Sequence, residues 1–161
     1  MTGLLIVWHS RTGGAEAMAR AAGDAAAIEG PVIVKRAEEV QPEDLLAAGG
    51  YLFACPENLA SMSGAMKEFF DRCYYPLLGR IEGRPYAAMI CAGSDGEGAA
   101  RQIARIATGW RLRAIAEPLI VYTHAQTPEA ILATKMIAEP DLARCRECGA
   151  TLAAGLAMGV F

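Results

Sequence analysis

The sequence GLLIVWHSRTGGA, residues 3–15, joins a short apolar run to a polar turn and to the start of an alanine-rich segment. A nearly unbroken apolar run is typical of a strand covered on both faces, as in a parallel sheet. Residues 15–28 are strong helix formers, Gly30-Pro31 ends that helix, and residues 32–35 resume strand composition. The segment therefore predicts a βαβ unit with HSRTGG as its first turn.

The same alternation continues along the chain. Because right-handed crossovers lay helices on the faces of a parallel sheet, we predict one α/β domain over residues 1–161. The predicted fold has three layers and five parallel strands in the order 2-1-3-4-5, so the loops after strands 1, 3 and 4 meet in one crevice. The further strands are expected at 51–55, 85–92 and 114–122, and the further helices at 41–46, 64–78, 99–112 and from 141 to near 155 or 159.

Composition narrows the classes of function. Fifteen basic and 18 acidic residues give a net charge of −3, scattered in short clusters, which argues against nucleic acid or an anionic membrane as a partner. Five cysteines, with Cys55 and Cys91 inside apolar runs, indicate buried thiols in a reducing cytoplasm. No apolar run approaches the roughly 20 residues that span a bilayer, and no signal peptide is recognisable. We therefore expect a cytoplasmic protein without membrane insertion.

The first loop, residues 10–15, has the composition of a phosphate-binding turn. Its hydroxyl groups can bond to phosphate oxygens, its two glycines allow the backbone to come close, and the N–H groups of the first helical turn face the anion. The spacing is neither that of a Walker loop nor GxGxxG. A plain helix cap has the same composition, so both interpretations stay open.

Two further loops carry unusual residues. In residues 56–62, Asn58, Leu59 and Ala60 can supply backbone amides for the polar edge of a flat heterocycle and apolar cover for one of its faces. Ser61 or Ser63 can also cap the helix that follows. In residues 93–98, three glycines directly follow a strand and can pass close beneath a ring, although turn formation alone explains two of them.

With these loops placed, the sequence resembles the flavodoxin family. SRTGG (10–14) matches the family's S/T-x-T-G-x phosphate loop, and PENLASMSGAMKEFFDR (56–72) is similar to a segment of flavodoxin-like quinone reductases and NADPH-dependent FMN reductases. The chain departs from the family at Ala15, where many members have Ser or Thr, and at Leu59, where an aromatic residue often covers the ring. The resemblance implies FMN as cofactor, with its phosphate held by Ser10, Arg11, Thr12, Gly13, Gly14 and Ala15 and its ring framed by Pro56, Glu57, Asn58, Leu59, Ala60, Gly93, Ser94, Asp95 and Gly96.

The resemblance also implies an oxidoreductase that passes reducing equivalents from NAD(P)H to a quinone or a similar small acceptor. Because the cofactor carries the redox chemistry, we predict no catalytic side chain. The near-balanced charge favours an enzyme over a strongly acidic electron carrier. A flavodoxin-type carrier and a flavin-binding redox module without NAD(P)H turnover stay open as alternatives.

The remaining candidates are interpreted as structural. His9 and His124 lie at predicted strand ends and are assigned to packing rather than to catalysis. Cys145-x-x-Cys148 falls inside the last helix without a second pair, so we expect neither a metal site nor a redox site. The segment 127–139, with its apolar residues Ile131, Leu132, Met136 and Ile137, suits either a contact in a homo-oligomer or a lid.

Overall fold

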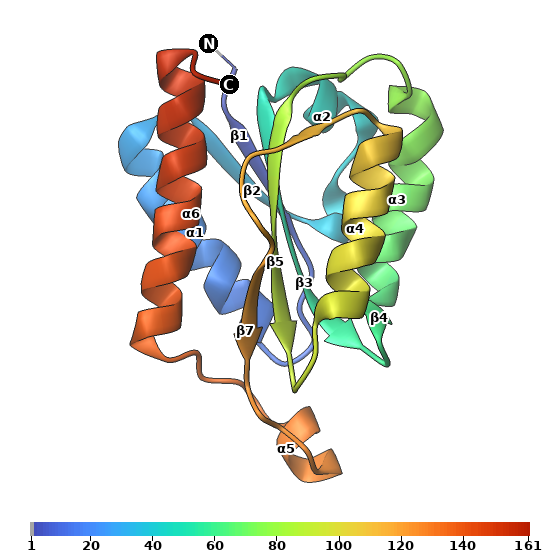
Figure 1. Cartoon of the computed structure of the whole chain (residues 1–161), viewed down its shortest axis with the longest axis vertical. Coiled ribbons are helices and arrows are strands. Elements are labelled where there is room, and N and C mark those ends of the chain that lie inside the picture. The colour runs from blue at the N-terminus through green and yellow to red at the C-terminus, as the bar shows by residue number, and fades with distance from the viewer. Residues whose placement is uncertain (1) are drawn as a thin grey trace.

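The computed structural model describes residues 2–161, which form three layers around a central sheet (Figure 1). Helices α1 (Gly14–Glu29) and α6 (Glu139–Met158) cover one face, and α3 (Gly64–Leu77) and α4 (Glu97–Gly109) cover the other. The short helix α5 (Pro128–Leu132) lies beyond the end of the sheet at which β5 and β7 finish. The other elements, in chain order, are β1 (Leu4–Trp8), β2 (Val32–Arg36), the 3-10 helix η1 (Ala37–Glu39), α2 (Pro42–Ala47), β3 (Gly50–Asn58), β4 (Ser61–Met62), β5 (Pro85–Ala92), β6 (Arg113–Ala114) and β7 (Leu119–Tyr122).

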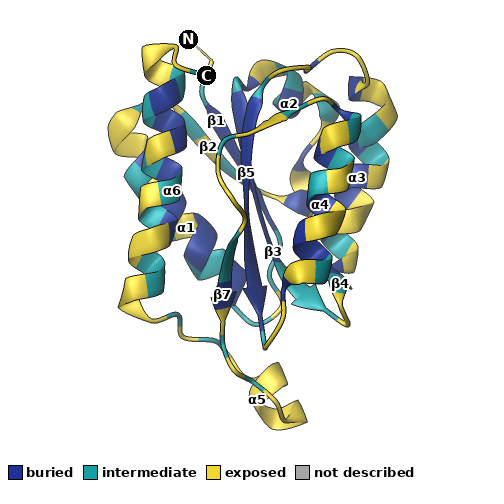
Figure 2. Cartoon of the chain, viewed as in Figure 1, coloured by how far each residue is buried: buried dark blue, intermediate teal, exposed yellow. Residues whose placement is uncertain are grey.

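The sheet is parallel except for one short strand, as the α/β prediction requires. Its order is β2-β1-β3-β5-β6, while β7 also pairs with β5 and β4 pairs antiparallel with β3. Every residue of β1 and β5 is buried, because helices cover both faces (Figure 2). This two-sided burial explains why these strands have unbroken apolar sequences.

The predicted five-stranded sheet of order 2-1-3-4-5 is wrong, because the sheet formed by residues 2–161 contains seven strands and runs β2-β1-β3-β5-β6. The expected strand at 114–122 is divided into β6 and β7, which both pair with β5. Ala114 lies opposite Tyr86 and Leu119 opposite Met89, so the chain advances five residues where β5 advances three. The extra residues bulge out of the ladder and include Pro118, which has no N–H to donate. The other additional strand, β4, falls in residues assigned to a loop.

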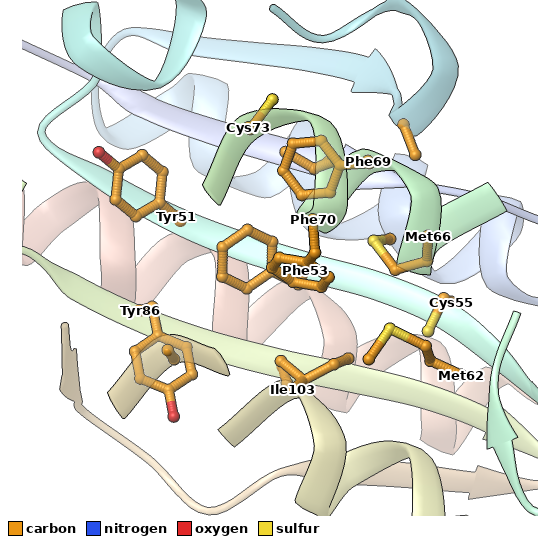
Figure 3. Packing of buried hydrophobic residues seen from close by; sticks show 14 of the residues in the cluster. Tyr51, Phe53, Cys55, Met62, Met66, Phe69, Phe70, Cys73, Tyr86 and Ile103 are labelled. Carbon is orange, nitrogen blue, oxygen red and sulfur yellow. The ribbon is translucent and has the colours of Figure 1, made fainter. Parts of the chain in front are cut away.

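Aromatic side chains fill the layer between the sheet and α3 and α4. Phe53 on β3 lies with its ring centroid 5.1 Å from that of Phe70 and 6.2 Å from that of Phe69, both on α3 (Figure 3). Trp110, fully buried at the end of α4, packs 5.7 Å from Phe70. These large buried rings fill the space between the sheet and the two helices, together with aliphatic side chains of the same cluster.

Small residues line the contact between α1 and α6 in the opposite layer. Buried alanines line α1, and Gly149 of α6 packs directly on the backbone of Ala22. A Cβ at position 149 would overlap the carbonyl oxygen and the Cα of Ala22, so only glycine allows the two helices to approach this closely. Within residues 2–161, no helix is long and apolar enough to span a membrane.

Replacing Gly149 with alanine is expected to force α1 and α6 apart. We expect the free energy of unfolding to fall by roughly 1–3 kcal/mol, the usual cost of overpacking a tight interface, measured by urea denaturation. Gly64→Ala is the matched control, because nothing lies within 4 Å of an added Cβ there. Equal losses of stability in the two variants would contradict this account of the helix packing.

Candidate cofactor-binding site

A crevice of about 440 Å³ opens at the carboxyl ends of β1, β3 and β5. The parallel pairing of these strands brings their three following loops together, as the strand order predicts. Two later segments complete the walls, one directly after β7 and the other formed by α5 and the residues that follow it. The lining residues are Arg11, Thr12, Pro56, Glu57, Asn58, Leu59, Cys91, Ala92, Gly93, Ser94, Thr123, Ala125, Ile131, Leu132 and Lys135.

The first loop forms a tight turn that leads into α1. Gly13 is the N-cap residue with φ of 95°, a left-handed conformation that glycine adopts without strain, and its N–H donates to Ser10 Oγ at 3.0 Å. The following N–H groups belong to the first turn of α1 and have no partners inside that helix. Arg11 and Thr12 line the crevice, whereas Ser10 turns its hydroxyl oxygen toward the loop itself.

Gly14 and Ala15 are buried beneath this turn. A Cβ at Gly14 would lie 2.6 Å from Cys91 Sγ, so glycine allows the start of α1 to pack on β5. Gly14 and Ala15 can therefore contribute backbone N–H groups only. Burial raises the pKa of the Cys91 thiol to about 11, which keeps this crevice-lining thiol protonated at neutral pH.

The second loop is a hairpin rather than the polar connector that the sequence analysis expected. β3 continues to Asn58, which pairs with Ser61, and Glu57 pairs with Met62. Leu59 and Ala60 form the turn with φ of 52° and 64°, a conformation that hairpin turns need and that costs energy in residues other than glycine. Leu59 is fully exposed at the tip and lines the mouth of the crevice, while Ala60 does not line it.

Glu57 connects the second loop to the third. Its carboxylate accepts hydrogen bonds from the N–H of Gly96 at 2.8 Å and from the N–H of Ala99 at 3.2 Å, and so caps α4. A carboxylate at a helix N-terminus satisfies free N–H groups and interacts favourably with the helix dipole. Glu57 therefore lines the crevice with both carboxylate oxygens already engaged.

In the third loop, only Gly93 and Ser94 face the crevice. Asp95 accepts a hydrogen bond from the N–H of Glu97 at 3.3 Å, and Gly96 is the buried N-cap of α4 with φ of 85°. The third glycine, Gly98, has a packing role, because a Cβ there would overlap the carbonyl oxygen of Ala60. Loops two and three are thus packed against each other.

Among the later segments of the site, Thr123, Ala125 and Lys135 were not predicted, and segment 127–139 was expected only as an oligomer contact or a lid. Thr123 and Ala125 follow the divided fifth strand, and Lys135 follows α5. Of the apolar residues in segment 127–139, Ile131 and Leu132 line the crevice, whereas Met136 is 90% exposed. The feature of the sequence that could have indicated a role in the site is Lys135, a basic residue among the apolar residues of this segment.

Neither histidine lines the crevice. His9 Nδ1 is hydrogen-bonded to Ser63 Oγ at 2.8 Å, and His9 Nε2 lies 3.7 Å from Glu38 Oε1. Burial lowers the pKa of His9. The nearby Glu38 carboxylate acts in the opposite direction and raises this pKa, while the positive charge of Arg11 lowers it further. Ser63, one of the expected helix caps, makes no side-chain cap bond and is buried against His9 instead.

Two other features support structural interpretations. A cavity of about 150 Å³ behind the first loop is well below the volume of typical cofactor sites; it is lined by Trp8, His9, Ser10, Glu16, Arg36 and Glu38. Cys145 is buried in α6, and burial raises its pKa to about 12. Nowhere in the described chain do three or more His, Cys, Asp or Glu side chains gather as a metal site would require.

The strand order and the crevice define a flavodoxin-like α/β protein, and solved structures agree. An archaeal flavodoxin superposes with a TM-score of 0.77 at 20% identity, covering 96% of this chain and 98% of its own. The Megasphaera elsdenii flavodoxin superposes with a TM-score of 0.70 at 21% identity, and the match covers 93% of this chain and 98% of that one. Rubredoxin oxygen:oxidoreductase from Desulfovibrio gigas superposes with a TM-score of 0.76 at 16% identity, and the match covers 98% of this chain but 36% of that one. At these identities the likeness shows the fold.

The chain belongs to the NADPH-dependent FMN reductase family, whose model matches residues 37–127. The resemblance seen in the sequence is thereby confirmed. A protein named flavodoxin from Aquifex aeolicus (strain VF5) is 33% identical over 97 residues, which are 59% of this chain. The chain spans about half the length of that relative, 52%. The first loop and the segment after α5 lie outside the residues that match the family model.

Removing the Glu57 cap is expected to loosen the contact between the second and third loops. Glu57→Ala should lower the free energy of unfolding by roughly 1–2 kcal/mol, because two N–H groups of α4 lose their acceptor. The control is Glu117→Ala, since Glu117 is exposed and no side-chain bond to it is found within residues 2–161. Chemical denaturation measures both, and an effect no larger in Glu57→Ala than in the control would contradict the capping role.

The lowered pKa of His9 predicts a pH dependence of stability. As the pH falls below 6.5, the unfolded chain takes up a proton at His9 before the folded chain does, so unfolding is favoured. The stabilisation is complete above pH 6.5 and is lost as the pH falls through the lowered pKa, with a slope of at most about 1.4 kcal/mol per pH unit for one proton. Denaturation of wild type and His9→Asn between pH 7.5 and 5 checks this; identical pH slopes would show that His9 has no such role.

Proposed function

We propose that the crevice binds FMN and that the chain, as one domain of residues 1–161, transfers electrons from NAD(P)H through this cofactor to a quinone or a similar small acceptor. The observation that carries the proposal is the meeting of the three predicted loops at one crevice of about 440 Å³. Cofactor sites typically occupy about 300–1,000 Å³.

The two ends of the crevice suit the two ends of FMN. The Thr12 hydroxyl, the Arg11 side chain and the free N–H groups at the start of α1 are donors for a phosphate. Asn58 and Gly93 offer polar and backbone groups for the edge of a ring, and Leu59 offers apolar cover. The residues present therefore fit a flat ring with a phosphorylated side chain.

FMN, when bound, supplies the redox chemistry by accepting a hydride and passing electrons onward. The chain's own residues hold the phosphate, orient the ring and restrict water at the crevice. Glu57 fixes the hairpin by its bonds to α4, and Ile131 and Leu132 add apolar side chains to the lining. No side chain in the crevice is assigned a proton-transfer role.

The choice of an enzyme is supported by membership of the reductase family and by the modest net charge of −3. A strongly acidic surface would steer a carrier toward basic protein partners, and such a surface is not encoded here. The second candidate is an electron carrier without NAD(P)H turnover, which the similarity to a protein named flavodoxin favours.

Binding of FMN is expected to depend on the first loop. Thr12→Ala removes a hydroxyl donor and Gly13→Val forces a β-branched residue into a left-handed conformation, so each should weaken FMN binding by about 10- to 100-fold. Quenching of flavin fluorescence gives the dissociation constants. Thr108→Ala is the control, because within residues 2–161 the Thr108 hydroxyl bonds only to Ala104 O, on the exposed face of α4. FMN affinity unchanged in both loop variants would refute the phosphate assignment.

The activity is tested on the purified wild-type chain loaded with FMN. Oxidation of NADH and NADPH is followed by absorbance with and without a quinone. Turnover that requires both the loaded chain and the quinone supports the reductase. Bound FMN with negligible NAD(P)H oxidation supports the carrier, and failure to bind FMN contradicts both.

A further inference from the structure

Lys135 packs directly against the first loop. Its backbone N–H donates to Thr12 O at 2.8 Å, which ties the segment after α5 to the turn before α1. A Cβ at Gly14 would lie 3.4 Å from Lys135 Cβ, so the two segments are in packing contact. Residues 123 positions apart in the sequence thereby form one wall of the crevice.

The ammonium group of Lys135 is held by neutral oxygens. Its Nζ donates to Ala133 O at 2.6 Å, to Ile131 O at 2.7 Å and, more distantly, to Thr12 Oγ1 at 3.3 Å. These bonds use all three donors of the group. No carboxylate in residues 2–161 forms an ion pair with it, whereas Lys35 pairs with Asp44 and Lys67 with Asp71. Lys135 therefore places an uncompensated positive charge at the crevice.

The charge lies where a phosphate would need it. A phosphate monoester carries close to two negative charges at neutral pH, and charge-assisted hydrogen bonds to it are stronger than neutral ones. Thr12 Oγ1 and Lys135 Nζ, 3.3 Å apart, are close enough to donate to the same anion. The long bond to Thr12 is the one that an anion can replace, while the two carbonyl oxygens keep the lysine in place.

From this geometry we infer that Lys135 binds the phosphate of FMN and makes the crevice selective for phosphorylated over unphosphorylated flavins. The inference rests on the proposed function, because it requires a flavin in the crevice. The lysine also replaces a contact that the first loop lacks, since Ala15 offers no hydroxyl group. Lys135 lies outside residues 37–127, so this role belongs to a part of the chain that the family match does not include.

Lys135→Met tests the inference, because methionine keeps much of the length of the side chain and removes the charge. The dissociation constants of FMN and riboflavin are measured for wild type and variant by fluorescence. We expect the FMN constant to rise about 10- to 100-fold and the riboflavin constant to stay unchanged. Lys67→Met is the matched control, since Lys67 lies on the exposed face of α3 and pairs with Asp71. Lys135→Arg, which keeps the charge, should recover much of the FMN affinity.

The ratio of the two constants separates a charge effect from a structural one. If Lys135 only anchored the segment that carries Ile131 and Leu132, its loss would weaken FMN and riboflavin equally, and that result overturns the inference. Unchanged FMN binding in Lys135→Met overturns it as well. A wild-type chain that binds neither flavin refutes the proposed function itself, whereas FMN binding without preference over riboflavin refutes only the role of Lys135.

A second measurement needs no variant. Acetylation of the three lysines in the folded wild-type chain is followed by mass spectrometry. We expect FMN to slow acetylation of Lys135 and to leave Lys67 unchanged, and riboflavin to protect neither. Equal protection of Lys135 by FMN and riboflavin would contradict direct contact with the phosphate.

Discussion

The buried parallel pairing of β3 with β1 and β5 is the constraint on which the site depends. Leu4 to Trp8 pair with residues 50–54, and residues 51–56 pair with residues 86–91, so the three strands end at one edge of the sheet. Their side chains are buried on both faces up to Cys55 of β3, and a slip in register would carry core residues to the wrong layer. Because the register is fixed, the three loops that follow must share one crevice.

Contacts between the loops then give the crevice its shape. Glu57 binds the start of α4, and Gly98 leaves space for the carbonyl oxygen of Ala60, so the second and third loops support each other. Lys135 joins the segment after α5 to the first loop. The walls of the crevice thus come from elements far apart in the sequence, and each wall is held by at least one specific contact.

The parts of the structure set by local patterns could be predicted. The apolar run before the first loop and the strand at 85–92 follow from composition, and so do the helices that alternate with them. The hairpin at Leu59 and Ala60 could not, since neither residue favours a positive φ and the turn forms in the context of the packed loops. Pro118 was visible in the sequence, but the bulge depends on register with β5. Within the site, the sequence could place loops but not the partners of Glu57 or Lys135, because those contacts are tertiary.

The central claim is that a phosphorylated flavin occupies the carboxyl edge of the sheet with its phosphate at the start of α1. A titration of the ¹⁵N-labelled chain with FMN, followed by amide chemical shifts, tests it most directly. The account predicts that the largest shifts occur at Thr12, Gly13 and Gly14 and at Gly93 and Ser94. Shifts confined to the opposite edge, around residues 79–84, or no shifts at all would contradict it.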